Sequence, residues 1–77
     1  MFTFEWNGKQ VTCISKSDLI EGRTYSGRCR NALKAVWNGK RFVYERSKFG
    51  DVYEESINHP EDFNGYDVFI PTKLLED

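Results

Sequence analysis

The sequence has few of the residues that build metal sites and disulfide frameworks, and no long apolar run. It contains one histidine, two cysteines and two prolines among 77 residues. Two cysteines suit either redox compartment, but no secretory leader is visible at the start of the chain, so we expect Cys13 and Cys29 to be free thiols in a reducing cytoplasm. No apolar run approaches the roughly 20 residues that a membrane helix needs. We therefore expect a cytoplasmic protein without a membrane partner.

Aromatic side chains supply most of the material for a core. The chain has six Phe, four Tyr and two Trp, while 30% of its residues are charged and the net charge is −1. At about 200 Å² for each ring side chain, burial of this set would remove roughly 2,400 Å² from water. A single domain over residues 1–77 can therefore fold without a metal, a cofactor or a disulfide.

The tetrapeptide Trp-Asn-Gly-Lys occurs twice, at residues 6–9 and 37–40. Asn-Gly suits the two central positions of a tight hairpin turn, where both residues need positive φ. Around Asn7-Gly8 this turn pairs Phe2 with Cys13 and separates the side chains with a period of two. The inward face then carries five side chains: Phe2, Phe4, Trp6, Val11 and Cys13.

The second copy predicts another hairpin, in which Trp37 faces Lys40. One face would again be apolar and point inward, with Leu33, Ala35, Trp37, Phe42 and Tyr44. The reverse face is mixed, because it combines Ala32, Val36 and Val43 with Lys34, Arg41 and Glu45. Apolar side chains on both faces favour a place in the middle of a curled sheet or barrel. Reuse of a good turn explains the repeat better than internal duplication.

The remaining segments predict shorter elements. We expect a helical turn or a loop around residues 17–21 and an irregular strand over residues 23–30. A third strand pair should turn at Gly50, which places Glu45 opposite either Glu54 or Glu55, an unfavourable contact in both registers. A third Asn-Gly pair, Asn64-Gly65, lies in a stretch rich in turn formers. A final strand over residues 66–71 should stop at Pro71, with Thr72 capping a last helical turn.

Together these elements predict an all-β domain of five to six antiparallel strands with a short helical turn. In so short a chain such strands hide an aromatic face best by curling into a small barrel. The layout resembles an SH3-like barrel. The stretch YERSKFGDVYEESINHPEDFNGYDVFIP is also similar to small uncharacterised proteins of phages and mobile elements, a resemblance that transfers no activity. In SH3-like barrels a loop such as EGRTYSGR borders the binding groove, which by resemblance makes Arg23 and Tyr25 contact residues.

Charge is strongly ordered along the chain. Residues 23–48 hold eight basic residues and one acid, whereas residues 49–77 hold eight acids and one lysine. The basic block could bind a nucleic acid backbone while an aromatic ring stacks on bases, with Arg23, Tyr25, Arg28, Arg30, Lys34, Trp37, Lys40 and Arg41 as the candidate residues. The alternative interpretation is that basic and acidic strands pair and neutralise each other.

Catalytic and metal sites find little support. The arginines that flank Cys29 would favour its thiolate, but no motif connects this cysteine with His59, the only histidine. The segment 58–62 gathers His59, Glu61 and Asp62, yet its spacing matches no metal-binding loop, and Glu54 and Glu55 are strand neighbours that point to opposite faces. The sequence thus predicts a non-enzymatic module without cofactor or metal. Its partner would be a protein, such as a host factor modulated by a phage-type accessory protein, with nucleic acid as the alternative.

Overall fold

The computed structural model describes residues 1–29, 32–62 and 67–75. Within these ranges the chain forms one 3₁₀ turn, η1 (Lys16–Asp18), and no α-helix, so no helix there could cross a bilayer. It forms seven strands: β1 (Phe2–Trp6), β2 (Lys9–Cys13), β3 (Thr24–Arg28), β4 (Lys34–Trp37), β5 (Phe42–Lys48), β6 (Asp51–Ile57) and β7 (Ile70–Leu74). The all-β class predicted from the sequence is confirmed, but the strand number of five to six is too low.

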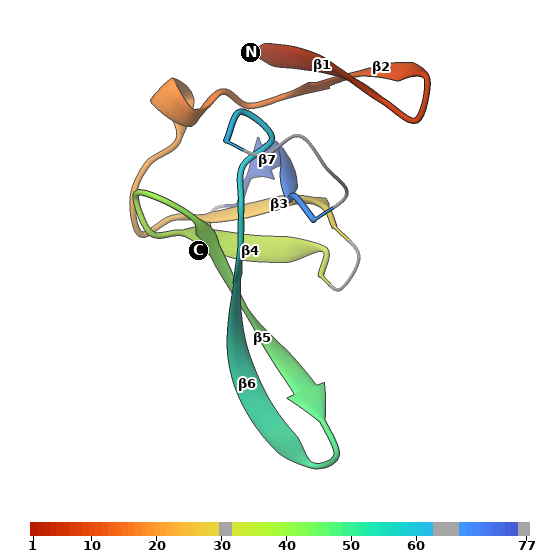
Figure 1. Ribbon diagram of the computed structural model, residues 1–77. Coiled ribbons are helices and arrows are strands. Elements are labelled where there is room, and N and C mark those ends of the chain that lie inside the picture. Colours follow the sequence, from red (N-terminus) through yellow and green to blue (C-terminus); the bar gives the residue numbers. More distant parts are fainter. Residues whose placement is uncertain (30–31, 63–66, 76–77) are drawn as a thin grey trace.

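The strands form two antiparallel sheets. One has the order β6-β5-β4-β3-β7, and the other consists of β1 and β2 alone, which lie across one end of the larger sheet (Figure 1). The larger sheet curls until the residue after β6, Asn58, forms an isolated bridge with Val68, and the Phe69 amide donates to the Asn58 carbonyl at 3.0 Å. Neither sheet closes on itself, so the barrel predicted from the sequence is present only as an open, curled sheet.

The inner face of the curl holds the core, as the period-two pattern predicts. Seven buried side chains make up the main cluster: Tyr25, Ala35, Trp37, Phe42, Tyr44, Ile57 and Phe69. A second cluster lies beneath the N-terminal hairpin, where Cys13, Val68 and Ile70 pack against the half-buried Phe2, Phe4, Trp6 and Val11. Leu33, expected to point inward, is instead 79% exposed, because it precedes β4 and lies outside the paired strand.

The first Trp-Asn-Gly-Lys segment forms the predicted turn. Asn7 and Gly8 both have positive φ, at 53° and 76°, and the ladder pairs Phe2 with Cys13 and Trp6 with Lys9. The predicted register of this hairpin is confirmed.

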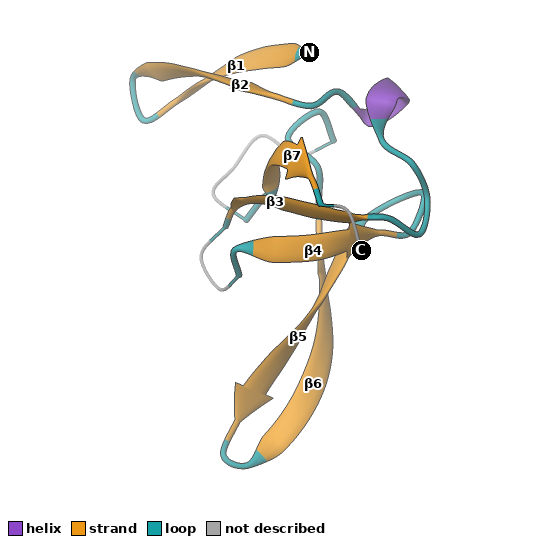
Figure 2. Cartoon of the chain, turned by 180° about the vertical axis from the view of Figure 1, so that it is seen from behind, coloured by secondary structure: helices purple, strands orange, loops and turns teal. Residues whose placement is uncertain are grey.

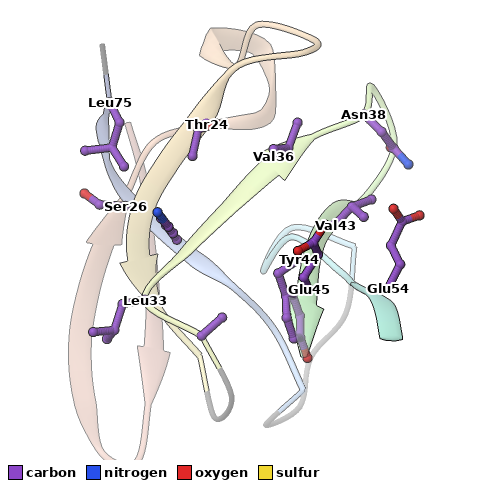
Figure 3. Close-up of a pocket in the computed structure, with 12 residues that line it drawn as sticks. Thr24, Ser26, Leu33, Val36, Asn38, Val43, Tyr44, Glu45, Glu54 and Leu75 are labelled. Atoms are coloured by element: carbon purple, nitrogen blue, oxygen red, sulfur yellow. The ribbon is translucent and has the colours of Figure 1, made fainter. Parts of the chain in front are cut away.

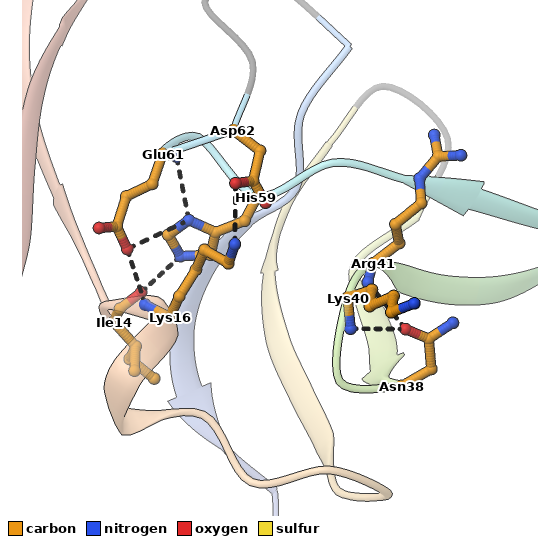
Figure 4. Close-up of polar contacts among 8 residues, drawn as sticks. All are labelled: Ile14, Lys16, Asn38, Lys40, Arg41, His59, Glu61 and Asp62. Carbon is orange, nitrogen blue, oxygen red and sulfur yellow. Dashed lines mark hydrogen bonds and ion pairs between the residues drawn. The ribbon is translucent and has the colours of Figure 1, made fainter.

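The second Trp-Asn-Gly-Lys segment forms a different turn. Trp37 pairs with Phe42 rather than facing Lys40, so the loop has four residues, 38–41. The Asn38 side-chain carbonyl accepts the amides of Lys40 and Arg41 at 2.9 and 2.7 Å (Figure 4). Asn38 thus acts as a loop cap and Gly39 alone has positive φ. The predicted register is wrong by two residues, an even shift that keeps the side chains of β4 and β5 on their expected faces.

The third hairpin follows the two-residue option. Phe49 and Gly50 have φ of 54° and 82°, Lys48 pairs with Asp51, and Glu45 lies opposite Glu54. Beyond its base this hairpin contacts no other described strand and projects from the body as an arm (Figures 1 and 2). We call residues 45–55 the arm.

The C-terminal segment differs from the prediction. Pro71 does not end the last strand but lies inside β7, opposite Gly27, where the ladder to β3 shifts register. A proline is tolerated there because β7 is the last strand of its sheet and Pro71 points its carbonyl away from β3, where it accepts the Ile14 amide at 2.9 Å, so the missing N–H lies outside the β3–β7 ladder. Thr72 is part of the same strand, so the helical turn expected to start at this residue is absent through Leu75. Arg30 and the Asn64-Gly65 pair lie outside the described residues.

Candidate functional site

A groove of about 1190 Å³ crosses the outer face of the larger sheet and reaches the core residue Tyr44 on β5 (Figure 3). Its lining combines apolar and polar side chains from five strands or their ends: Thr24, Ser26, Ala32, Leu33, Lys34, Val36, Asn38, Val43, Tyr44, Glu45, Glu54 and Leu75. Leu33 and Val36 are large apolar side chains that remain 79% and 37% exposed. The groove therefore has an apolar floor that folding does not cover.

The groove arises where two neighbouring strands part. Only two residue pairs join β4 to β5, Val36 with Val43 and Trp37 with Phe42, whereas seven pairs join β5 to β6. β5 therefore leaves β4 after Val43 and continues into the arm. The second hairpin lies in the middle of a curled sheet, as one of the two predicted placements requires, and its mixed face lines this opening. Apolar residues on both faces were the sequence signal for it.

Opposite charges lie on the two sides of the groove. Lys34 pairs with Ser26 on the β3 side, while Glu45 and Glu54 face each other across the β5–β6 ladder. Figure 3 shows both carboxylates at the same end of the groove. Among the described residues neither glutamate forms an ion pair. The predicted like-charge contact is thus present and lies in the groove wall.

The predicted stacking residues are not available to a ligand. Tyr25 is 1% exposed and its hydroxyl accepts the Ile20 amide at 2.8 Å, and Trp37 is 4% exposed against Phe42. Both predictions are wrong because these rings face the core from β3 and β4. A period of two from Ala35 already placed Trp37 on the inner face.

The predicted basic residues are exposed but do not form one patch. Arg28 and Lys34 lie where β3 ends and β4 begins, whereas Arg23, Lys40 and Arg41 lie at the opposite ends of these two strands. None of these five forms an ion pair with the described residues. The Glu21 carboxylate lies against Gly39, in the loop that carries Lys40 and Arg41. The second group of cations is therefore interleaved with an acid.

On the arm, basic and acidic side chains of neighbouring strands lie close together, as the alternative interpretation of the charge order predicts. Arg46 forms an ion pair with Glu55 at 3.5 Å, and Lys48 lies opposite Asp51. Lys48 also places its ammonium 5.5 Å from the ring centre of Phe49.

His59 is fully buried and joins the N-terminal segment to the body (Figure 4). Its Nε2–H donates to the Ile14 carbonyl at 2.8 Å, and its Nδ1 accepts the Glu61 amide at 3.0 Å. Its ring also stacks on Phe42, with centroids 6.1 Å apart. Burial lowers the pKa of His59, so the ring is neutral at pH 7 and both nitrogens are occupied. We read His59 as a structural link, a role that its position two residues after the buried Ile57 could have revealed.

The groups considered for catalysis are not assembled into a site. Both thiols are free. Burial raises the pKa of Cys13 to about 11, and the Cys29 thiol donates to the Ala32 carbonyl at 3.4 Å. In the described part of the chain, no three His, Cys, Asp or Glu side chains lie close enough together to hold a metal ion.

Comparison with known proteins adds no assignment. No family model, curated protein or solved structure matches the chain. The resemblance to phage-type proteins and to SH3-like barrels therefore remains a prediction.

Proposed function

We propose that this chain is a non-enzymatic protein-binding module and that the outer groove is its binding site. The observation that carries the proposal is the exposed apolar floor around Leu33 and Val36. Exposed apolar surface of this kind, rimmed by polar groups, is typical of interaction sites. The groove is open and exceeds the roughly 300–1,000 Å³ of small-molecule pockets, so it suits a protein segment better than a metabolite.

The predicted SH3-like relationship belongs to the same proposal. Five antiparallel strands curled around one aromatic core support it, although neither sheet closes. Small modules of this class bind extended segments in aromatic or apolar surface grooves.

The test is quantitative capture from a lysate of the organism that encodes the chain. We compare the wild type, Leu33→Asp in the groove and Gln10→Asp on the exposed face of β2. Both positions are exposed, so both variants should fold. We expect at least one protein that the wild type and Gln10→Asp retain and that Leu33→Asp loses by about tenfold or more, because a buried charge weakens an apolar contact. Equal capture by all three chains, or no capture by any, would refute the proposal.

A second function, binding of nucleic acid, is favoured by one observation. The five described cations of residues 23–41 have no ion-pair partner among the described residues and can contact phosphates. Their division into two groups and the burial of both stacking rings make this the weaker proposal. Nucleic acid binding predicts that the chain is retained on heparin at about 50 mM salt. Retention should fall steeply with added salt and in the double variant Arg23→Ala plus Arg41→Ala. If the chain is not retained at that salt concentration, the proposal of nucleic acid binding is refuted.

A further inference from the structure

The outer edge of β6 has no partner along the arm. β6 pairs with β5 on one side only, and no other backbone hydrogen bond involves residues 51–56 within the described chain. The edge is covered from Asn58 onward, where Val68 and Phe69 meet it. An open strand edge is a template for a further strand, and proteins use such edges to bind extended segments.

The backbone groups on this edge can be assigned from the turn. Lys48 and Asp51 flank the two turn residues, so they form a hydrogen-bonded pair, and pairs alternate along an antiparallel ladder. The N–H and C=O groups of Val52 and Glu54 therefore point away from β5. The side chains of these two residues share the face that forms the groove, because alternate residues of a strand lie on one face. Val52 is 66% exposed and Glu54 lines the groove.

The charge next to this edge defines the partner. Glu45 and Glu54 face each other with no cation in ion-pair range among the described residues. Opposed like charges destabilise a sheet, and a cation on an added strand would relieve their repulsion. A second copy of this chain cannot supply that cation through its own β6, since Asp51, Glu54 and Glu55 would then meet the same acids.

We infer that β6 takes up an extended segment of a partner protein that carries Lys or Arg at alternate positions. The added strand forms main-chain hydrogen bonds with Val52 and Glu54 and directs its basic side chains toward Glu54 and Glu45 at the end of the groove. This inference rests on the proposed function and names the chemistry of the partner. The open edge supplies affinity and the two carboxylates select a basic segment.

The experiment uses a fluorescein-labelled (Lys-Val)₄ peptide as the probe and measures anisotropy at about 100 mM salt, where remote charges are screened. A second peptide of the same sequence is N-methylated at alternate residues, which removes hydrogen-bond donors without changing its charge. We expect the methylated peptide to bind the wild-type chain about tenfold more weakly. Equal affinity for both peptides, or no affinity for either, would overturn the inference.

Two variants of the protein, in place of a changed peptide, also test whether the probe adds a strand to β6. Val52→Pro removes an outward N–H and leaves the ladder to β5 intact, and Val52→Thr is its matched control. Glu54→Lys reverses the selecting charge, and Glu5→Lys, on exposed β1, is its control. We expect Val52→Pro and Glu54→Lys each to weaken probe binding about tenfold, while both controls bind like the wild type. Binding of Val52→Pro at wild-type strength would show charge attraction without strand addition.

The two proposals can fail separately. If Leu33→Asp loses a captured protein while Val52→Pro and Glu54→Lys keep it, the groove binds a partner and the inference about β6 is wrong. If Leu33→Asp keeps every captured protein, the proposed function fails, whatever the peptide does.

Discussion

The N-terminal hairpin and the arm are built on the same turn and differ in what their strands cover. Asn7-Gly8 and Phe49-Gly50 have similar φ angles, 53° and 76° in the first turn and 54° and 82° in the second. The strands beside Asn7 pack an apolar face, which includes Cys13, on Val68 and Ile70. The strands beside Phe49 leave that ring 91% exposed. Turn geometry therefore says little about what a hairpin contributes: the first completes a core, and the second leaves its surface available for contact.

The largest expected effect is the difference in stability loss between a core substitution at the start of β5 and a substitution on the arm. Phe42 is fully buried against Tyr25, Trp37 and Phe69, so Phe42→Ala should lower the free energy of unfolding by about 3–5 kcal/mol. Tyr53→Ala on the arm should cost less than about 1 kcal/mol, because that ring is half exposed. Urea unfolding followed by tryptophan fluorescence measures both. Equal losses would mean that the arm is part of the cooperative core.

The next effect concerns the link between the N-terminal hairpin and the body. Burial lowers the pKa of His59 below its usual 6.5, so the unfolded chain takes up the proton first. The free energy of unfolding should therefore fall as pH drops below about 6.5 toward the lower pKa of the folded state, by at most about 1.4 kcal/mol per pH unit. Above pH 6.5 this contribution is fully present.

Urea unfolding between pH 8 and pH 5 checks the sign, with His59→Gln as the control, whose profile should lack this component. Hydrogen exchange locates the change. Amides of β1 and β2 should lose protection at low pH, because a charged ring is disfavoured in this buried site and its protonated Nδ1 can no longer accept the Glu61 amide. Faster exchange confined to the arm would contradict the assignment.

A reciprocal exchange of turn residues tests the two hairpins directly. Phe49→Asn should raise the free energy of unfolding by about 1 kcal/mol, because asparagine tolerates positive φ better than phenylalanine. Asn7→Phe should lower it by a similar amount. Urea midpoints measure both, and Phe49→Ala separates the loss of the exposed ring from the gain in backbone preference. Destabilisation by Phe49→Asn would show that the ring supports the fold.

The smallest effect should come from exposed ion pairs. Lys16 contacts Asp62 at 2.8 Å on the body, and Arg46 contacts Glu55 at 3.5 Å on the arm. Lys16→Met and Arg46→Met should each cost about 0.2–1 kcal/mol and less at high salt, since both pairs are solvent-exposed. Thermal unfolding at low and high salt compares them. A loss of several kcal/mol at either position would indicate a buried charge.

The sequence predicted local geometry well and long-range placement poorly. The register at Asn7-Gly8 follows from residues that lie next to each other in the chain, whereas the turn at Gly50 allowed two registers, of which the structure has the two-residue one. The loop after Trp37 could not be predicted, because the same Asn-Gly pair either turns directly or caps a longer loop with the asparagine side chain. Which of these occurs depends on where Phe42 packs.

The candidate site was predicted only in its parts. The mixed face with Val36 and Val43 and the opposed glutamates were visible in the sequence. Their meeting in one groove depends on the short β4–β5 ladder, which no local pattern shows. Tyr25 was assigned to a ligand because its neighbours are basic and glycine-rich, yet its ring completes the core.

By itself, the sequence determined the all-β class, the inward face of the N-terminal hairpin and its turn at Asn7-Gly8, because alternation and turn dihedrals depend on neighbouring residues. Only the tertiary structure decided that the sheet stays open, that Pro71 lies within β7, that His59 is buried and that β5 parts from β4 to leave a groove beside an unpaired edge. These features depend on contacts between strands that are far apart in the sequence but share one small core. No pattern of neighbouring residues reveals such contacts.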